Sequence, residues 1–408
     1  MIFKQTAVSW LVASALVVMS SGAVAGGFGL IEQSGSGMGN AFAGGAASAE
    51  DASTIYYNPA GMSRIQGTQV AVAVHAIRPT AKFNGTGIPP AVNMGGDPGS
   101  WGYVPNGYFS MEINPSLTAG LGLNAPFGMQ TQYDAGWVGR NHGIKSKIET
   151  INLNPSIAYK VSDTLSLGAG ISYQQIRGGL SSFAGVAGTS QLNGSDSAWG
   201  YNFGALFNVT PQTRVGVSYR SQIKYTLKGD VSFSAIPALN GPVSLAITMP
   251  DTFSTSVFHQ LNDKWDLMAD ATWTGWSVLK ELRVLRASGA LLSLTPENWS
   301  DTWRFSTGAN YHYNEKWMAR VGVAYDQTPV ADMYRTVRIP DQSRTWLSLG
   351  GQYKPSKDTA IDVGYTHLFM KDTPINSALA QPTNLPSISG TYTSISTNIL
   401  SAQYTHSF

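Results

Sequence analysis

Residues 26–62 read GGFGLIEQSGSGMGNAFAGGAASAEDASTIYYNPAGM, and this stretch decides how the rest of the chain is interpreted. It is rich in Gly, Ala and Ser, and it has too few large aliphatic residues to bury a core of its own. Its apolar residues follow neither the helical period nor the alternation of a strand. They nevertheless recur, at Phe28, Leu30, Ile31, Phe42, Ile55, Tyr56 and Tyr57. Such a segment has to pack inside another part of the chain, and we expect residues 67–408 to enclose it as a closed β-barrel.

The composition narrows the class of protein before any motif is considered. The 408 residues include 26 Lys and Arg against 24 Asp and Glu, so the charge balance gives no reason to expect a nucleic-acid partner. Charged residues make up 12% of the chain, about half the usual share of a soluble protein, while aromatic residues reach 11%. The mean hydropathy of −0.07 is far too low for a helical membrane protein. A chain that alternates apolar and polar residues would average to such a value.

Cysteine is absent, which excludes disulfide bonds and Cys–His zinc sites. The histidines are scattered along the chain, and none belongs to an HExxH metal motif. We therefore predict no metal and no other cofactor. Stability has to come from packing or from a closed network of backbone hydrogen bonds.

The N-terminus has the parts of a secretory signal peptide. Lys4 supplies positive charge, residues 7–19 form a short apolar core, and Ala23-Val24-Ala25 provides a cleavage site of small residues. The apolar core is too short to span about 30 Å of hydrocarbon as a permanent anchor. We predict that residues 1–25 are removed and, since no later segment is long and apolar enough, that the chain has no transmembrane helix.

From residue 67 onward one pattern repeats. Stretches of about ten residues alternate between apolar and polar side chains, and the connections between them are short polar turns and long loops in strict alternation. Residues 165–173 are an example, with Leu165, Leu167 and Ile171 on one face and small or polar residues on the other. The pattern predicts fourteen strands, near 67–78, 105–113, 116–124, 147–160, 165–177, 198–208, 213–228, 249–261, 264–284, 302–313, 316–327, 343–354, 359–370 and 394–408.

A soluble β-sandwich would also alternate, but it would mix its short and long loops. Here Trp and Tyr recur at the strand ends, where a membrane barrel has its aromatic girdles, and the strand number is even. We therefore predict an all-β fold, a fourteen-stranded antiparallel transmembrane β-barrel in the outer membrane of a Gram-negative bacterium. Residues 67–408 would form the barrel, and residues 26–66 would fold back into its lumen as an N-terminal hatch, or plug.

Several strands carry charges on the face opposite the apolar one. On the lipid face each Arg or Lys would cost about 2–4 kcal/mol at mid-membrane, so we expect these residues to point into the lumen. They could pair with one another in a hydrated interior or contact a ligand, and both alternatives stay open. The residues are Arg220, Lys224, Asp266, Asp270, Arg304, Arg320 and Asp362.

Several stretches give the chain a resemblance to a known family. They are GSGMGNAFAG at 35–44, NPA at 58–60, NLNPS at 152–156, TWTGWS at 272–277, RVGVAYDQTPV at 320–330 and IPDQSRTWLS at 339–348. Together they resemble the long-chain fatty acid outer-membrane transporters, the FadL family, over nearly the whole mature chain. The resemblance implies no enzymatic activity, but passive uptake of hydrophobic compounds, above all long-chain fatty acids. An outer groove would capture the ligand, an inner pocket would bind it, and hatch movement with a kinked third strand would open a lateral route.

The resemblance also points to the hatch motif and to the third strand. Asn58, Pro59 and Ala60 match the hatch signature, and a turn is expected there because proline fixes its own φ and biases Asn58 toward an extended conformation. Gly120 and Gly122 are the candidates for the strand kink, since glycine inside a strand often marks a bend. The alternative is that these two glycines make room for the hatch.

A fatty acid needs an apolar slot for its tail and a cation for its carboxylate. Phe28 and Leu30, at the mature N-terminus, could cap the slot. Arg177 is the candidate cation, with a salt bridge in the lumen or at the rim as the alternative. The outer loops at 125–146 and 178–197 carry apolar residues that suit a capture groove, or the packing of one loop onto another, among them Phe127, Met129, Trp137 and Phe183.

Three other functions stay open. The same mechanism would serve aromatic or other hydrocarbons, and an absence of cations from the pocket would favour them. An outer-membrane lipid hydrolase would need Ser, His and an acid or amide on adjacent strands, yet no G-x-S-x-G elbow accompanies His259 or His312. A water-filled porin would conduct ions steadily, and the hatch argues against it. We expect a monomer in contact with outer-membrane lipid, whose partner is a hydrophobic small molecule.

Overall fold

The computed structural model of the chain describes residues 26–87, 93–376, 385 and 387–408. The predicted signal peptide, residues 1–25, lies outside them. No helix of the described part is long and apolar enough to cross a membrane. The helical segments are short: α2 (Gly35–Met38), α3 (Gly45–Ser48), α4 (Thr54–Tyr57), η1 (Pro59–Arg64), η2 (Gly185–Ala187), η3 (Pro237–Leu239), η4 (Trp276–Val278) and η5 (Asp332–Tyr334).

A single antiparallel sheet contains the strands of the described residues and forms fourteen barrel strands. Eight are continuous: β1 (Thr68–Thr86), β2 (Gly102–Asn114), β5 (Lys145–Lys160), β6 (Leu165–Phe183), β7 (Thr189–Asn208), β16 (Trp317–Asp326), β17 (Arg344–Ser356) and β20 (Ser389–Ser407). The other six are interrupted: β3 (Leu117–Asn124) with β4 (Gly128–Gln132), β8 (Thr213–Arg220) with β9 (Ile223–Phe233), β10 (Gly241–Met249) with β11 (Thr252–Gln260), β12 (Trp265–Thr274) with β13 (Glu281–Arg286), β14 (Leu291–Pro296) with β15 (Thr302–His312), and β18 (Thr359–Met370) with β19 (Thr373–Asn376).

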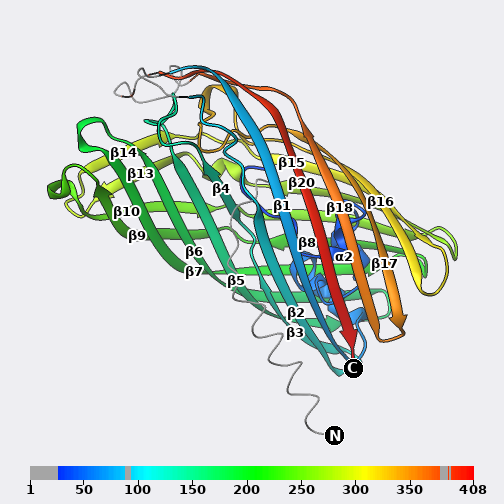
Figure 1. Cartoon of the computed structure of the whole chain (residues 1–408). Helices are drawn as coiled ribbons and strands as arrows, with labels where there is room; N and C mark the ends of the chain where they lie inside the picture. Colours follow the sequence, from blue (N-terminus) through cyan, green and yellow to red (C-terminus); the bar gives the residue numbers. More distant parts are fainter. Residues whose placement is uncertain (1–25, 88–92, 377–384, 386) are drawn as a thin grey trace, which may run out of the picture.

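The sheet closes on itself because β20 pairs with both β18 and β1. The β1–β20 ladder runs from Gln69 opposite Ser407 to Thr86 opposite Ser389, so the first and last strands join along most of their length (Figure 1). Closure removes the free sheet edges, which is the condition for strands to cross a lipid bilayer. The predicted fourteen-stranded antiparallel barrel is confirmed.

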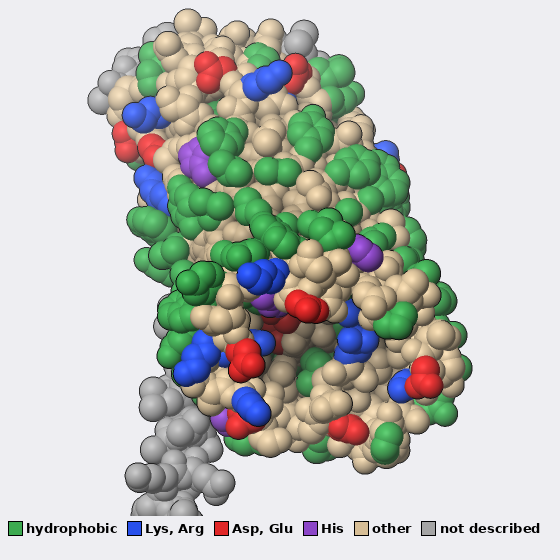
Figure 2. Space-filling view, turned by 90° about the vertical axis from the view of Figure 1, so that its right-hand side faces the viewer, with side chains coloured by type: hydrophobic (Ala, Val, Ile, Leu, Met, Phe, Trp, Pro, Cys, Tyr) green, Lys and Arg blue, Asp and Glu red, His purple; other side chains and the backbone are tan. Residues whose placement is uncertain are grey.

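Side chains of the barrel strands alternate between an exposed outer face and a buried inner face. In β16 the alternation is complete, with Trp317 and Tyr325 about half exposed and Arg320 only 3% exposed. On the face shown in Figure 2, hydrophobic side chains cover the middle and most charged side chains lie toward the two ends. A lipid bilayer solvates an apolar belt of this kind, so the outer face is the membrane face.

The predicted inward charges, such as Asp270, Arg304 and Asp362, are buried, but Lys224 is exposed. The prediction for Lys224 was wrong because the strand is interrupted between Arg220 and Ile223. Even-numbered residues point inward in β8, whereas odd-numbered residues do so in β9. Two residues without strand pairing are enough to reverse the two faces.

The strands extend further than the alternation predicted. β6 continues to Phe183 and β7 begins at Thr189, and these two residues are paired. The predicted outer loop at 178–197 is therefore mostly a β-hairpin, and only residues 184–188 connect its strands. The barrel wall formed by β6 and β7 consequently rises well beyond the predicted membrane segment.

The hatch, residues 26–66, lies inside the barrel, where most of its side chains are buried (Figure 1). Arg320 reaches it from the wall and donates to the carbonyl of Ser36 at 2.8 Å and to the two carboxylate oxygens of Glu50 at 2.5 and 2.8 Å. Its guanidinium also pairs with Asp362 at 2.8 Å. Arg320 is buried, and release of the hatch would remove the Ser36 carbonyl and the Glu50 carboxylate that compensate its charge. This contact therefore anchors the hatch.

Asn58 ties the hatch to a second part of the wall. It is buried and extended, with φ at −159°, and it forms the N-cap of η1, as the following proline predicted. Its Nδ2 donates to the carbonyls of Ala46 at 2.7 Å and Ala205 at 3.0 Å, while its Oδ1 accepts from the amide of Ala60. A Cβ atom at Gly204 would overlap Asn58 Oδ1, so β7 can approach the hatch this closely only with glycine there.

Asn58→Asp tests this attachment, because the substitution keeps the shape of the side chain but removes both N–H donors. The carbonyls of Ala46 and Ala205 would lose their partner at a cost of about 1–3 kcal/mol each. We expect hatch amides to exchange hydrogen at least about tenfold faster, measured by mass spectrometry on the full chain. Asn314→Asp, in an exposed turn, is the control and should change nothing in the hatch. Equal hatch protection in both variants would contradict the prediction.

Candidate functional site

The third barrel strand is broken within the wall. β3 ends at Asn124 and β4 begins at Gly128, with Ala125, Pro126 and Phe127 between them. β3 pairs with both β2 and β5, whereas β4 pairs only with β5 in the part of the chain that the structure describes. The wall between β2 and β4 therefore lacks its ladder of hydrogen bonds. Proline suits such a break because it has no N–H group to donate.

The break does not lie at the predicted kink residues. Gly120 and Gly122 are paired in register on both sides. A Cβ atom at Gly120 would lie 2.7 Å from Ile55 Cδ1, and one at Gly122 would lie 3.2 Å from Ile55 Cγ2. The position predicted for the kink is therefore corrected to residues 125–127. The alternative interpretation, that the two glycines make room for the hatch, agrees with these contacts.

The N-terminal end of the hatch supplies the partners that the broken strand lacks. Leu30 N donates to Pro126 O at 2.8 Å, and Gly128 N donates to Phe28 O at 3.0 Å. The segment that precedes the first helix thus pairs with the third strand from inside the lumen. Movement of this segment would uncover the break in the wall and the interior of the barrel at the same place.

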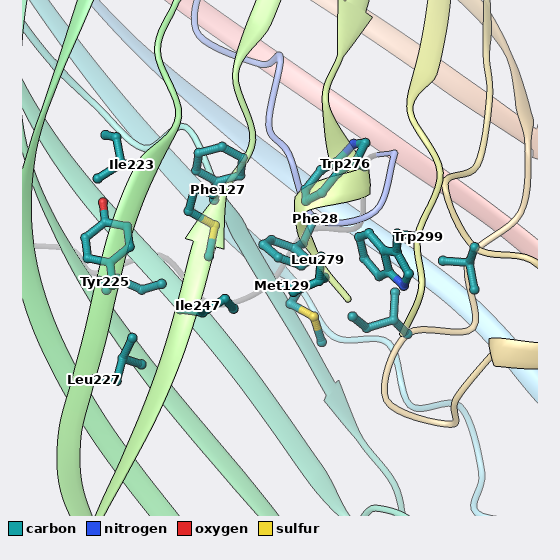
Figure 3. Close-up of a cluster of buried hydrophobic side chains, with 14 residues drawn as sticks. Phe28, Phe127, Met129, Ile223, Tyr225, Leu227, Ile247, Trp276, Leu279 and Trp299 are labelled. Atoms are coloured by element: carbon teal, nitrogen blue, oxygen red, sulfur yellow. The ribbon is translucent and has the colours of Figure 1, made fainter. Parts of the chain in front are cut away.

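Phe28 lies among aromatic rings from three other segments (Figure 3). Its ring centroid is 4.9 Å from that of Trp276, 5.6 Å from that of Trp299 and 6.1 Å from that of Phe127. Met129, Ile176 of β6 and aliphatic residues of β9 and β10 also belong to this buried group, which we call the aromatic cluster. Three predicted ligand residues, Phe28, Phe127 and Met129, therefore lie together.

A cavity of about 1090 Å³, counting its open mouth, lies beside the aromatic cluster, and we call it the inner cavity. Leu30, Phe127 and Trp276 contribute apolar walls, and the hatch lines a further side. The lining is not apolar throughout, because the barrel strands add charges. The charged lining residues are Arg220, Asp270, Arg304 and Asp326.

Arg304, on β15, has N–H groups without acceptors at this cavity. The residue is 6% exposed, its Nη2 donates to the carbonyl of Ala41 in the hatch at 2.7 Å, and its guanidinium carbon lies 4.9 Å from the centroid of the Trp346 ring. Among the described residues, its Nε and Nη1 have no hydrogen-bond acceptor. Buried donors without a partner are rare and cost about 1–3 kcal/mol, more for a charged group. The inner cavity therefore offers two N–H groups to an anion.

Two further cavities continue toward the long connections. The wall groove, of about 610 Å³ counting its open side, follows the wall along β5, β6, β7, β9, β10 and β13. The outer cavity, of about 1120 Å³, includes Phe183, Arg335 and Arg338. The two cavities share the side chains of Leu180, Leu192, Leu282 and Val284.

Two predicted ligand residues lie elsewhere. Arg177 is exposed on the outer face of β6, because strand alternation places it opposite Ile176, which is buried in the aromatic cluster. Trp137 is fully buried and stacks on Tyr133, with ring centroids 3.9 Å apart, in a separate cluster beneath the long connections. Neither residue lines any of the three cavities. Leu30 lines the inner cavity, and Phe183 lines the outer one.

Trp276, Trp299 and the unpaired donors of Arg304 were not predicted from the sequence. A signal for Trp276 was present, because the two tryptophans of TWTGWS are three residues apart and cannot share one face of a regular strand. Trp276 indeed lies on η4, after β12 has ended. Trp299 lies in a connection without any pattern, and the free donors of Arg304 depend on distant hatch residues.

These features define the class: a transmembrane β-barrel, filled by an N-terminal hatch, with partly apolar cavities in its lumen and a break in its wall. In the described ranges no group of three or more His, Asp or Glu residues could hold a metal ion.

The particular family follows from comparison with known proteins. Residues 16–408 match the family of outer membrane protein transport proteins (OMPP1/FadL/TodX), and the chain belongs to this family. The long-chain fatty acid transport protein of Salmonella typhi is 30% identical over 403 residues, which cover 89% of this chain and 92% of the relative. The chain is therefore an outer-membrane transport protein that crosses the membrane with fourteen strands.

Solved structures agree with this fold. A FadL homologue from Pseudomonas aeruginosa matches with a TM-score of 0.87 at 27% identity, over 94% of this chain and all of that one. The toluene transporter TbuX of Ralstonia pickettii matches with a TM-score of 0.69 at 21% identity, over 93% of this chain and all of its own. At that identity the second match concerns the fold alone.

Gly27→Ala should release the N-terminal end of the hatch from the broken strand. Gly27 has a φ of +63°, which costs other residues about 1–2 kcal/mol, and its Cβ atom would lie 2.6 Å from Trp299. We expect the Leu30 amide to exchange hydrogen at least about tenfold faster. Gly29→Ala is the control, since its Cβ atom would lie an ordinary 3.4 Å from Trp276. Similar Leu30 exchange in both variants would refute the prediction.

Glu32 makes the seating of the hatch depend on pH. It is 1% exposed, and its Oε2 has no hydrogen-bond partner among the described residues. Burial raises the pKa of this carboxyl from 4.5 to about 7, although Arg304 and Arg344 favour its charged form. Asp326 is the acidic group that faces it. Glu32 is therefore protonated at mildly acidic pH when the hatch is seated, and ionised when it is in water.

The sign of the effect follows from the raised pKa. Below about pH 4.5 the carboxyl is protonated in both states, and the seated hatch loses stability as the pH rises to about 7, by about 3 kcal/mol in total. Glu32→Gln should abolish this loss. The measurement is the protection of hatch amides at pH 5 and pH 8, corrected for intrinsic exchange. Wild-type protection that is equal at both pH values would contradict the prediction.

Proposed function

We propose that this protein takes up long-chain fatty acids across the outer membrane by passive diffusion. The observation that carries the proposal is the buried guanidinium of Arg304, with two N–H groups that lack acceptors, beside a cavity with Leu30, Phe127 and Trp276 in its wall. A fatty acid supplies a carboxylate for the Arg304 guanidinium and an alkyl chain for the apolar wall. The name of the Salmonella typhi relative supports the same class of ligand.

The two acidic residues that line the inner cavity together with Arg304 leave its donors available. Both carboxylate oxygens of Asp270 accept hydrogen bonds from the wall, from Ser256 at 2.6 Å and from Thr272 at 2.9 Å. Asp326 pairs with Arg344 at 3.5 Å. A carboxylate ligand would therefore complete the hydrogen bonding of Arg304. A hydrocarbon would leave it incomplete, which is why hydrocarbon uptake is the second candidate.

The cavities suggest the route of the ligand. It would enter at the outer cavity, pass to the inner cavity and leave sideways at residues 125–127, where the wall lacks its ladder. Arg320 and Asn58 hold the hatch to the wall, so the path along the barrel axis stays filled. A filled lumen also argues against the steady ion conductance of a porin. We propose that the protein works as a monomer in outer-membrane lipid, with a mature chain of hatch 26–66 and barrel 67–408.

We propose no catalytic step. Ser401, His75 and Asn106 form a hydrogen-bonded row of the residue types that a hydrolase needs, with Ser401 Oγ 2.6 Å from His75 Nδ1. Asn106 Nδ2 donates to the carbonyl of Glu32 and lies 3.0 Å from His75 Nε2, which must therefore accept. The proton is then on Nδ1 and points at the serine, whereas a catalytic base has to accept the serine proton. All three residues are also buried.

Arg304→Gln should weaken binding of oleate but not of its methyl ester. A hydrogen bond to a charged group contributes about 1.5–3 kcal/mol, so the Kd for oleate should rise about tenfold to a hundredfold. The neutral ester should bind both proteins within about threefold, because it offers no charge. Titration calorimetry on the purified full chain measures both.

Arg214→Gln is the matched control. Arg214 also holds hatch carbonyls, those of Ala47 and Ser48, but it does not line the inner cavity. Its oleate affinity should stay near that of the wild type. Equal losses of oleate and ester binding in Arg304→Gln would indicate a loosened hatch and not a lost anion contact, and unchanged oleate binding would refute the proposal.

A further inference from the structure

The wall groove has a floor without side chains. Gly178 on β6, Gly194 on β7 and Gly229 on β9 lie opposite one another at one level of the inner face. Leu180 and Leu192 form the next paired level on one side. At the glycine level the inner wall therefore recedes by the depth of a side chain, and the groove of about 610 Å³ lies over it.

Close strand approach explains only one of these glycines. A Cβ atom at Gly229 would overlap the carbonyl oxygen of Asn193, so no other residue fits there. A Cβ atom at Gly194 would meet nothing closer than 3.4 Å, and one at Gly178 would lie 3.2 Å from the flexible end of Leu227. Neither of these two has a left-handed backbone. Neither packing nor backbone conformation thus requires glycine at positions 178 and 194. The effect of having glycine there is that no side chain fills the groove.

The groove is continuous with a cavity or cluster at each end. It shares Leu180, Leu192 and Val284 with the outer cavity. At the other end Ile176 and Leu227 belong to both the groove and the aromatic cluster. Its apolar side chains are all aliphatic, in contrast to the rings that surround Phe28. From the level of Leu180 to that of Ile176 the distance along the strand is roughly 13 Å.

We propose that the wall groove is the track for the alkyl chain of the ligand as it moves from the outer to the inner cavity, with Gly178 and Gly194 as the residues that set its width. The inference rests on the proposed function for the identity of the ligand. An aliphatic trough one side chain deep accepts an unbranched alkyl chain along its length. A side chain at Gly194 would occupy the trough itself.

The first test compares Gly194→Leu with Gly179→Leu. Gly179 also borders the groove, but it is the next residue along β6, so its side chain would point to the outer face, where its Cβ atom would lie 3.1 Å from Asn193 Oδ1. In cells that express the full chain, we expect oleate uptake to fall at least about tenfold in Gly194→Leu, because the side chain fills the trough, and to change less than about twofold in Gly179→Leu. Full uptake by a Gly194→Leu protein that is folded in the outer membrane would overturn the proposal.

The second test needs no uptake and a smaller side chain. Since the chain has no cysteine, Gly194→Cys and Gly179→Cys each introduce one thiol. Hexadecane or oleate should slow the reaction of iodoacetamide with the thiol at 194 and leave the reaction at 179 unchanged. If the ligand slows the reaction at position 194 in a protein that takes up no fatty acid, the wall groove binds alkyl chains but the proposed function is refuted. Absence of protection by either probe would overturn the track, whatever the uptake result.

Discussion

Inside a lipid bilayer every backbone N–H and C=O group needs a partner from the protein, and the structure depends on this constraint. The closed ladder from β1 around to β20 meets it along much of the wall, and one place where it does not is the side of β4 that faces β2. There Phe28 and Leu30 of the hatch supply hydrogen bonds from inside the lumen. The segment that satisfies the broken strand also closes the inner cavity, so a single movement can open the cavity and the wall together.

The lumen has two parts with different physical character. Around Arg320 and Asn58 it is polar, and the hatch is held by hydrogen bonds and by glycines that let the wall approach it. From the aromatic cluster through the wall groove it is mostly apolar, whereas the outer cavity adds polar side chains and two arginines. A ligand in the apolar part does not compete for the bonds that anchor the hatch. The anchors can therefore persist while Phe28 and its neighbours move.

Strand alternation and turn residues predicted the fourteen strands and the membrane face, because the bilayer imposes one pattern on every strand. The hatch was predicted from the aperiodic, Gly-, Ala- and Ser-rich composition of residues 26–62. Single residues were predicted less well where the pattern slips. Two unpaired residues after Arg220 reversed the faces and exposed Lys224, and simple parity places Arg177 outside the lumen. Phe127 and Met129 were predicted for an outer capture groove, yet they lie with Phe28 in the aromatic cluster. The donors of Arg304 depend on where the hatch folds, which no local pattern encodes.

In our proposal the inner cavity binds a fatty acid through Arg304, and a crystal structure of the full chain with bound oleate would show this contact. We expect the carboxylate within hydrogen-bond distance of Arg304 Nε and Nη1, with the alkyl chain against the aromatic cluster. A carboxylate bound only in the outer cavity, or an alkyl chain in the inner cavity whose carboxylate points away from Arg304, would rule out this role of Arg304.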